Sequence, residues 1–209
     1  MTQDSIDRRT RWQRVYRTRS PDAVSWYRPH LQVSLDLLEL AGLAVGSSLI
    51  DVGGGASTLV DDLLDRGVRD LSVLDVSPEA LAIARGRLGA RATDVTWLAV
   101  DLLQAALPEG EFDLWHDRAV LHFLTNPPDA LQYARQAARA VRIDGHAVIG
   151  GFAPDGPERC SGLRVARRSA EEIAALLAPA FQLVAKQTER HRTPAGAEQS
   201  FEYALLLRK

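Results

Sequence analysis

The sequence predicts an α/β domain in which a mostly parallel sheet lies between two layers of helices. Short apolar segments alternate with helical segments, three glycines follow the first apolar segment, and no helix separates the last two apolar segments. Alternating strands and helices build βαβ units with parallel strands. The chain has 209 residues, of which 46% are apolar, so we expect one domain over residues 1–209 with a full-sized core.

Seven strands and five helices are predicted in this order. The strands are apolar runs at residues 48–52, 70–75, 95–100, 112–116, 146–152, 181–186 and 200–207. The helices comprise residues 31–40, 56–66, 78–88, 128–141 and 169–177. Helix boundaries are indicated by Gly67, which ends the second helix, and by Ser77 and Pro78, which suit the N-cap and first position of the third.

The C-terminal third shows where the parallel order ends. A turn at Asp144-Gly145 separates the fourth helix from the fifth strand, and Ser169 caps the fifth helix. Residues 187–199 contain Pro194 and Gly196 and connect the last two strands. We therefore expect these two strands to form an antiparallel pair at the edge of the sheet.

The N-terminal 30 residues are polar and rich in arginine, with aromatic residues among them. We expect residues 1–30 to form a short helix and a loop that fold over the domain as a lid, although an arginine run is usually a solvated surface. The two candidates for closing over a ligand are Trp26 and Tyr27, for which packing of the segment is an equal alternative.

Composition and charge exclude several classes of protein. A net charge of −2 argues against a general nucleic-acid binder, which usually carries a basic excess. Cys160 is the sole cysteine, so no internal disulfide can form, and no Cys/His cluster has metal-ligand spacing. No apolar run approaches the ~20 residues that span a bilayer. We expect a cytoplasmic monomer or homodimer with no bound metal and no membrane contact.

The glycine loop after the first strand is the first candidate ligand site. Ligands bind beyond the carboxyl ends of parallel strands, where glycines allow the backbone to approach them closely. The loop reads DVGGGAST from residue 51 to 58. A dinucleotide pattern counted from Gly53 would need a glycine at Thr58, and one counted from Gly54 would need it at Ala56. A phosphate-binding P-loop would need a lysine. Asp51 suits the ammonium of a ligand with an amino-acid end, or it merely caps the turn.

Acidic residues also end the second and third strands. Asp75 can accept two hydrogen bonds from a ribose diol, as in nucleotide-binding folds generally. Asp101 can accept from an adenine amino group while a neighbouring backbone N–H donates to the ring. Each carboxylate could instead cap the turn that follows it. Three acidic residues at the ends of successive strands favour a ligand with ammonium, ribose and adenine groups.

At these motifs the chain resembles the class I, Rossmann-like S-adenosylmethionine-dependent methyltransferases. The resemblance is carried by LIDVGGG at 49–55, VLDVS at 73–77 and VDL at 100–102. Further segments resemble one subgroup, which includes citrate synthase lysine methyltransferase and its uncharacterised bacterial relatives. These segments are FDLWHDRAVLHFL at 112–124, FAPDGPERCSGL at 152–163, Trp12 and Ser25-Trp26-Tyr27. The resemblance implies a three-layer fold with a seven-stranded, mostly parallel sheet and one antiparallel strand at its edge.

The resemblance also implies S-adenosyl-L-methionine as cofactor. The residues expected to bind it are Trp12, Trp26, Asp51, Gly53, Gly54, Gly55, Ser57, Thr58, Asp75, Val76, Asp101, Leu102 and Asp117. His116, Asp117 and Arg118 are implied to lie below the sulfonium. The sequence departs from the subgroup at Arg167-Arg168, where an aromatic residue is usual, so contacts after the fifth strand are expected to differ.

Three residues are candidates for the chemistry itself: His122, Arg118 and Tyr27. His122 follows the fourth strand and is the candidate general base, which only a protonated nucleophile such as an amine or hydroxyl requires. His116 lies inside the strand, and we expect it to be buried with a backbone partner. Arg118 could pair with Asp117 or with the cofactor carboxylate.

The acceptor of the methyl group stays open at this point. A small molecule with a thiol, another chalcogen or an amine is favoured by the compact chain, and a protein lysine is the alternative. A nicotinamide-dependent oxidoreductase is disfavoured by the missing third glycine. A cofactor-binding regulator without activity is a further hypothesis.

Overall fold

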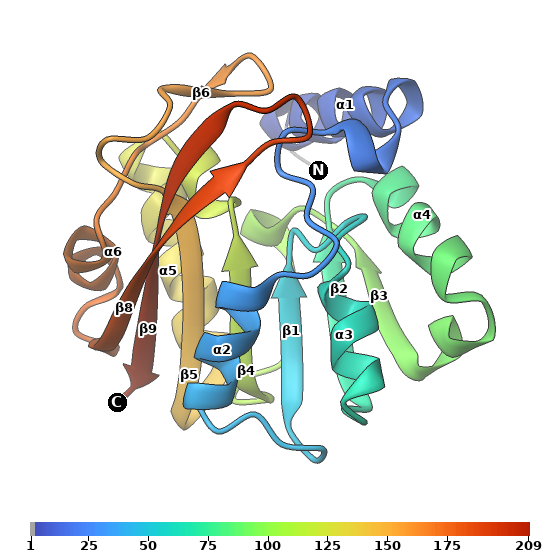
Figure 1. The fold of residues 1–209 in the computed structure, drawn as a ribbon. Coiled ribbons are helices and arrows are strands. Elements are labelled where there is room, and N and C mark those ends of the chain that lie inside the picture. The colour runs from blue at the N-terminus through green and yellow to red at the C-terminus, as the bar shows by residue number, and fades with distance from the viewer. Residues whose placement is uncertain (1–2) are drawn as a thin grey trace.

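The computed structural model describes residues 3–209 and contains a twisted seven-stranded sheet covered by helices on both faces (Figure 1). The strands of this sheet are β1 (Ser48–Val52), β2 (Asp70–Asp75), β3 (Val95–Ala99), β4 (Phe112–Arg118), β5 (Val141–Phe152), β8 (Phe181–Arg192) and β9 (Glu198–Arg208). A separate hairpin consists of β6 (Arg159–Cys160) and β7 (Leu163–Arg164). Residues 1 and 2, which belong to the predicted lid, lie outside the described residues.

The helices follow the predicted order, beginning with the helix expected within residues 1–30. They are α1 (Gln3–Thr18), α2 (Gln32–Leu40), α3 (Leu59–Asp65), α4 (Pro78–Leu88), α5 (Pro127–Ala140) and α6 (Ala170–Leu177). Short 3₁₀ turns comprise Pro21–Ala23, Gly89–Asp94, Leu102–Gln104 and Leu121–Phe123. No helix within residues 3–209 has the length and apolarity needed to cross a membrane.

The strand order is β3-β2-β1-β4-β5-β9-β8, which confirms the predicted fold class. Strands β1 to β5 are parallel to one another, whereas β9 runs antiparallel to both β5 and β8. The last two strands thus form this side of the sheet as a pair, and β8 is the outermost strand. Because strand order reverses between β1 and β4, a ligand site is expected beyond their carboxyl ends.

The two faces of the sheet support two separate cores. On one face, Leu35 of α2 and Leu63 of α3 pack with Leu49 of β1. On the other face, Tyr133 of α5 and Ile173 of α6 pack with sheet residues such as Ile50. Side chains of successive strand residues point to opposite faces, so neighbours in β1 enter different cores and hold the three layers together.

Several predicted boundaries differ from the structure: the helix predicted from residue 56 begins at Leu59, the fourth strand extends to Arg118, and the largest differences lie in the C-terminal third. The predicted turn at Asp144-Gly145 lies within β5, where Asp144 has a φ of 63° and the pairing with β4 shifts register. A local irregularity accommodates these residues, so the strand begins at Val141 rather than at His146. The predicted linker 187–199 is also mostly strand, because its polar residues alternate between the two faces of β8, and the connection is only residues 193–197.

The N-terminal helix α1 is a full 16 residues long and lies across the side of the sheet where the parallel strands end (Figure 1). An ion pair between Arg17 and Glu79 ties it to α4. The β6–β7 hairpin lies on the same side of the sheet (Figure 1). These two elements cover the site at the strand ends.

Candidate functional site

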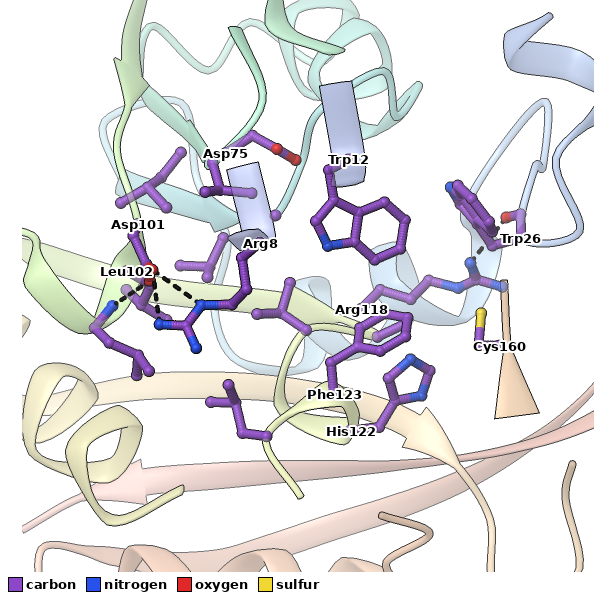
Figure 2. A pocket seen from close by; sticks show the side chains of 18 of the residues that line it. Arg8, Trp12, Trp26, Asp75, Asp101, Leu102, Arg118, His122, Phe123 and Cys160 are labelled. Carbon is purple, nitrogen blue, oxygen red and sulfur yellow. Dashed lines mark hydrogen bonds and ion pairs between the residues drawn. The ribbon is translucent and has the colours of Figure 1, made fainter. Parts of the chain in front are cut away.

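A pocket opens at the carboxyl ends of β1 to β4, beneath α1. The empty space around it, with the open solvent at its mouth included, is about 940 Å³. Figure 2 shows two distinct ends: Asp75, Asp101 and Arg8 lie at one, whereas Arg118, His122, Trp26 and Cys160 lie at the other. The first end carries both carboxylates of the described lining, and the second is walled mainly by aromatic rings.

The glycine loop forms the floor of this pocket with a backbone that admits no larger residue. Gly53 has a φ of +68°, and a Cβ there would collide with Val120. A Cβ on Gly54 would collide with the carboxylate of Asp51, and one on Gly55 would lie 2.7 Å from Oδ2 of Asp75. The three glycines therefore let the chain pass directly over the acidic side chains.

Asp75 ends β2 and lines the pocket with 7% of its surface exposed. Its Oδ1 accepts a hydrogen bond of 2.7 Å from the backbone N–H of Ser77. Burial raises the pKa of this carboxyl group to about 7, against the lowering effect of that hydrogen bond. Among residues 3–209 this carboxylate has no cationic partner and few hydrogen-bond donors.

Asp101 lies just beyond β3 and is held from two sides. Its Oδ1 accepts a bond of 3.1 Å from Leu103 N–H, and its Oδ2 accepts bonds of 3.0 and 2.9 Å from Nε and Nη2 of Arg8. Arg8 belongs to α1, so this ion pair fastens the helix over the pocket. Val76 and Leu102 line the same end.

A second, smaller pocket adjoins the first on the other side of the glycine loop. It is lined by Tyr27, Asp51, Gly54, Ser57, Thr58 and His116 among others. Four residues line both pockets and therefore lie between them, namely Tyr16, Trp26, Gly53 and Arg118. This pocket is small and polar, and the carboxylate of Asp51 faces it.

His116 differs from its prediction in its partner. It is buried as expected, but its Nδ1 lies 2.7 Å from Oδ1 of Asp51 and its Nε2 lies 2.9 Å from Oγ of Ser34. Both contacts are with side chains rather than with backbone. Asp51 and His116 are register partners on the adjacent parallel strands β1 and β4, which places their side chains together on one face.

Arg118 ends β4 and is fixed by contacts on three sides. Its Nε donates to the hydroxyl of Tyr203 at 2.9 Å, and its Nη1 donates to the carbonyl of Trp26 at 3.0 Å. The guanidinium also lies 4.5 Å from the ring centre of Phe201. Its Nη2 is buried without a hydrogen-bond partner in the described chain, and the nearest carboxylate oxygen, on Glu189, is 3.8 Å away.

His122 lies in the turn after β4 and is 2% exposed. The rings of Phe123 and Phe152 enclose it at centroid distances of 4.3 and 4.9 Å. Neither ring nitrogen has a hydrogen-bond partner within the described residues. Burial, with the positive charges of Arg118 and Arg168, lowers its pKa to about 3. His122 is therefore a neutral imidazole at the wall of the pocket.

Two residues expected to bind cofactor line neither pocket. Asp117 is fully buried, and its two oxygens accept hydrogen bonds from the backbone N–H groups of Val120 and Leu121. The acidic side chain thus shapes the turn after β4. Gly55 also lies outside both linings, although its position against Asp75 requires a glycine.

Several lining residues had no signal in the sequence. Arg8 belongs to an arginine-rich run in which no single member stands out, and Phe201 lies in the last strand, far along the chain. Arg168, one of the two arginines at which the sequence departs from the subgroup, lies near the site. Arg168 donates to the carbonyls of Leu121 and Leu124 on either side of His122. Within residues 3–209 no three His, Cys, Asp or Glu residues are grouped to hold a metal ion.

Comparison with known proteins agrees with this geometry. Residues 49–145, just under half of the chain, match the family model described as a methyltransferase domain. This segment of the chain is therefore similar to methyltransferase domains. The matched segment contains the glycine loop, both pocket carboxylates, Arg118 and His122.

Solved structures share the fold of this protein over nearly the whole chain. A structure solved for the conversion of a disulfide bond into a thioacetal group during echinomycin biosynthesis has a TM-score of 0.76 and 21% identity, covering 96% of this chain and 92% of that one. The N-methyltransferase NodS of Bradyrhizobium japonicum WM9, solved with S-adenosyl-L-homocysteine, has a TM-score of 0.74 and 20% identity, covering 96% and 97%.

Among curated proteins, the domain is similar to the eEF1A lysine and N-terminal methyltransferase of Danio rerio. The identity is 25% over 132 residues, which are 63% of this chain and 19% of that protein. The matched part is thus about a fifth of the length of this relative. The names of these three proteins point to different methyl acceptors or reactions, so the comparisons leave the acceptor open.

Proposed function

We propose that this protein transfers the methyl group of S-adenosyl-L-methionine to a small-molecule nucleophile. The observation that carries the proposal is the second end of the pocket, a cavity enclosed by Trp12, His122, Phe152 and Phe201 beneath α1. A methyl acceptor held there is surrounded by side chains. Such enclosure suits a compact substrate better than a residue on the surface of a folded protein.

The residues present fit the cofactor at each of its parts. We assign its amino-acid end to the small polar pocket of Asp51, Gly53, Gly54, Ser57 and Thr58. A Cβ at Gly53 would collide with Val120 and one at Gly54 with Asp51, so only glycine lets the loop pass this close to the Asp51 carboxylate, which lines the same pocket.

We assign the ribose to Asp75 with Val76, and the adenine to Asp101 with Leu102. A buried carboxylate with free lone pairs at Asp75 suits a diol, because two hydroxyl donors would restore the hydrogen bonds that burial removed. Trp12 and Trp26 stand edge-to-face 5.8 Å apart over the pocket and would close on the bound cofactor.

When bound, the cofactor supplies a methyl group on a sulfonium. The nucleophile forms a bond to the methyl carbon while the sulfonium sulfur keeps the electron pair of the broken bond. The chain's own residues orient the reactants and exclude water, which are the main contributions to such a displacement.

The roles of the three candidate catalytic residues follow from their surroundings. His122 is a weak base in this environment, so we assign it to hydrogen bonding with the acceptor rather than to proton removal. Arg118 lies between the two pockets, and we assign it to placing its positive charge there. Tyr27 lines only the small polar pocket, and we assign it to the cofactor side.

The second candidate function is methylation of a protein lysine. It is favoured by the similarity to the eEF1A lysine and N-terminal methyltransferase over 132 residues. The resemblance of residues 112–124 and 152–163 to the subgroup of citrate synthase lysine methyltransferase supports it further. Both functions share the cofactor site and differ only in what enters the acceptor end.

One labelling experiment separates the two functions. The protein is incubated with methyl-labelled S-adenosylmethionine and a cell lysate, and the lysate is then divided into small-molecule and protein fractions. We expect the label in small molecules. Label confined to a discrete protein band would contradict the proposal, and the variant Asp75→Asn serves as the control for activity that depends on the site.

A further inference from the structure

The acceptor end of the pocket combines aromatic walls with a small set of polar atoms. Arg118, His122 and Cys160 face the same space beside Trp12 and Phe123 (Figure 2). Arg118 Nη2 and both ring nitrogens of His122 are buried and lack hydrogen-bond partners in the described chain. Three such atoms at one end of a pocket indicate a ligand, since buried polar groups are normally paired.

The fixed charge at this end is positive. Glu189 is the nearest carboxylate, and it is shared: its Oε1 lies 2.6 Å from Nη2 of Arg28, and its Oε2 accepts the hydroxyl of Tyr203 at 2.8 Å. One carboxylate therefore balances two arginines, Arg28 and Arg118. The two carboxylates of the described lining, on Asp75 and Asp101, lie at the opposite end (Figure 2).

No group at this end accepts a proton readily. The pKa of His122 is lowered to about 3, and burial raises the pKa of the Cys160 thiol to about 11, so both side chains are neutral at pH 7. An ammonium entering here would find a positive charge and no base. An anion would find Arg118 and a neutral imidazole that can donate one hydrogen bond.

We propose that the acceptor end binds a thiol as its thiolate, with Arg118 stabilising the negative charge and His122 donating to sulfur. The inference rests on the proposed function and names its substrate class. The thiol proton passes to bulk water, and the sulfur keeps the lone pair that attacks the methyl carbon.

A thiol fits this environment better than the other nucleophiles. A free thiol ionises near pH 8.5, and an opposite charge within about 4–6 Å lowers such a pKa by about 1–3. Burial raises the pKa of the Cys160 thiol at the same end, so the anion of a bound thiol depends on the hydrogen bonds that Arg118 Nη2 and His122 have left to donate. An aliphatic alcohol is far too weak an acid for the same effect to ionise it. Sulfur also packs favourably against aromatic rings such as Phe123 and Phe152.

The test compares two probes that differ only in the nucleophilic group, phenylmethanethiol and benzylamine. The protein is first saturated with S-adenosylhomocysteine, which supplies the cofactor's carboxylate without its sulfonium, so any shift reports the protein's own groups. The pKa of the bound thiol is measured from the ultraviolet absorbance of the thiolate. We expect it at least one unit below the value in water, a tenfold preference for the anion, and we expect weaker binding of benzylamine.

The pH series must allow for the groups that surround Arg118. They are Glu189, Tyr203, Cys160, His122, His191 and, through Glu189, Arg28. Arg118→Met should abolish the shift, and Arg118→Lys should keep part of it. Arg159→Met is the matched control, because it removes an exposed arginine next to Cys160 and should leave the shift intact. If Arg118→Met does not fold, the wild-type shift still decides.

The outcomes separate this inference from the proposed function. A bound thiol with an unchanged or raised pKa, or benzylamine bound as tightly as the thiol, overturns the inference. Methylation of benzylamine together with an unshifted thiol supports small-molecule transfer and overturns the thiolate. A lowered thiol pKa with label found only on a protein band supports the thiolate subsite and contradicts the proposed function.

Discussion

Asp75→Asn is expected to change cofactor affinity and protein stability in opposite directions. The pKa of Asp75 rises from 3.8 to about 7 on folding, chiefly because the carboxyl group is buried. A group whose pKa is raised in the folded state destabilises the protein as pH rises from the unfolded value to the folded one, and the full cost is present above it. At 1.36 kcal/mol per pH unit, ionised Asp75 costs the cofactor-free protein at most about 4 kcal/mol at pH 8.

Asparagine removes this cost and keeps an oxygen for the Ser77 N–H. We therefore expect Asp75→Asn to have a higher free energy of unfolding than wild type at pH 8, with a difference that shrinks toward pH 4. Cofactor binding should instead weaken by about 2–3 kcal/mol, or about 30- to 150-fold, because a ribose diol loses its charged acceptor.

The assays are thermal unfolding from pH 4 to pH 8 and calorimetric titration with S-adenosylhomocysteine. Wild-type affinity should rise with pH up to about 7, with proton release on binding, and Asp75→Asn should lose this dependence. Asp70→Asn, at the exposed start of the same strand, is the control and should change neither quantity. A variant that is less stable at pH 8 and binds normally would refute both the ribose assignment and the burial argument.

Three further changes probe the loop, the buried pair and the lid. Gly53→Ala forces a Cβ into Val120 at a positive φ, so calorimetry should show at least tenfold weaker binding of S-adenosylhomocysteine, with circular dichroism unchanged; unchanged affinity would contradict the role of the loop. His116→Phe leaves the buried carboxylate of Asp51 unpaired, so we expect the free energy of unfolding to fall by about 3 kcal/mol and Tm by roughly 6–12 °C. A fall below about 1 kcal/mol would contradict the role of this pair. Arg8→Ala removes the ion pair with Asp101 that fastens α1 over the pocket. Stopped-flow tryptophan fluorescence should therefore show faster cofactor dissociation in this variant than in the control Arg11→Ala, and equal rates would contradict the role of α1 as a lid.

Residues at the ends of strands were predictable from the sequence because the chain itself marks those ends. Asp75 and Asp101 follow apolar runs, and α4 begins and ends where Ser77, Pro78 and the last leucine indicate. The carboxyl ends of parallel strands share one edge of a sheet, so these positions converge without knowledge of any side-chain contact.

Contacts that depend on the register between strands could not be predicted from the sequence. Asp51 and His116 are 65 positions apart, and their pairing follows from the alignment of β1 with β4, which no local pattern specifies. In the same way, the arginine run of α1 gives no sign that Arg8 rather than its neighbours turns toward Asp101. The length of β8 was underestimated because its polar residues 186–192 look like a loop until β9 pairs with them.

The two ends of the pocket come from different parts of the chain. Asp75, Asp101 and the glycine loop all lie within the matched residues 49–145, and they form the end that we assign to the cofactor. The walls of the other end come largely from outside that segment, namely from α1, from the end of β5, from the β6 hairpin and from β9. Changes in these elements can alter the acceptor without disturbing the cofactor end. We therefore expect the substrate of this chain to be specified at Phe152, Cys160 and Phe201, together with Arg118, which lines both pockets.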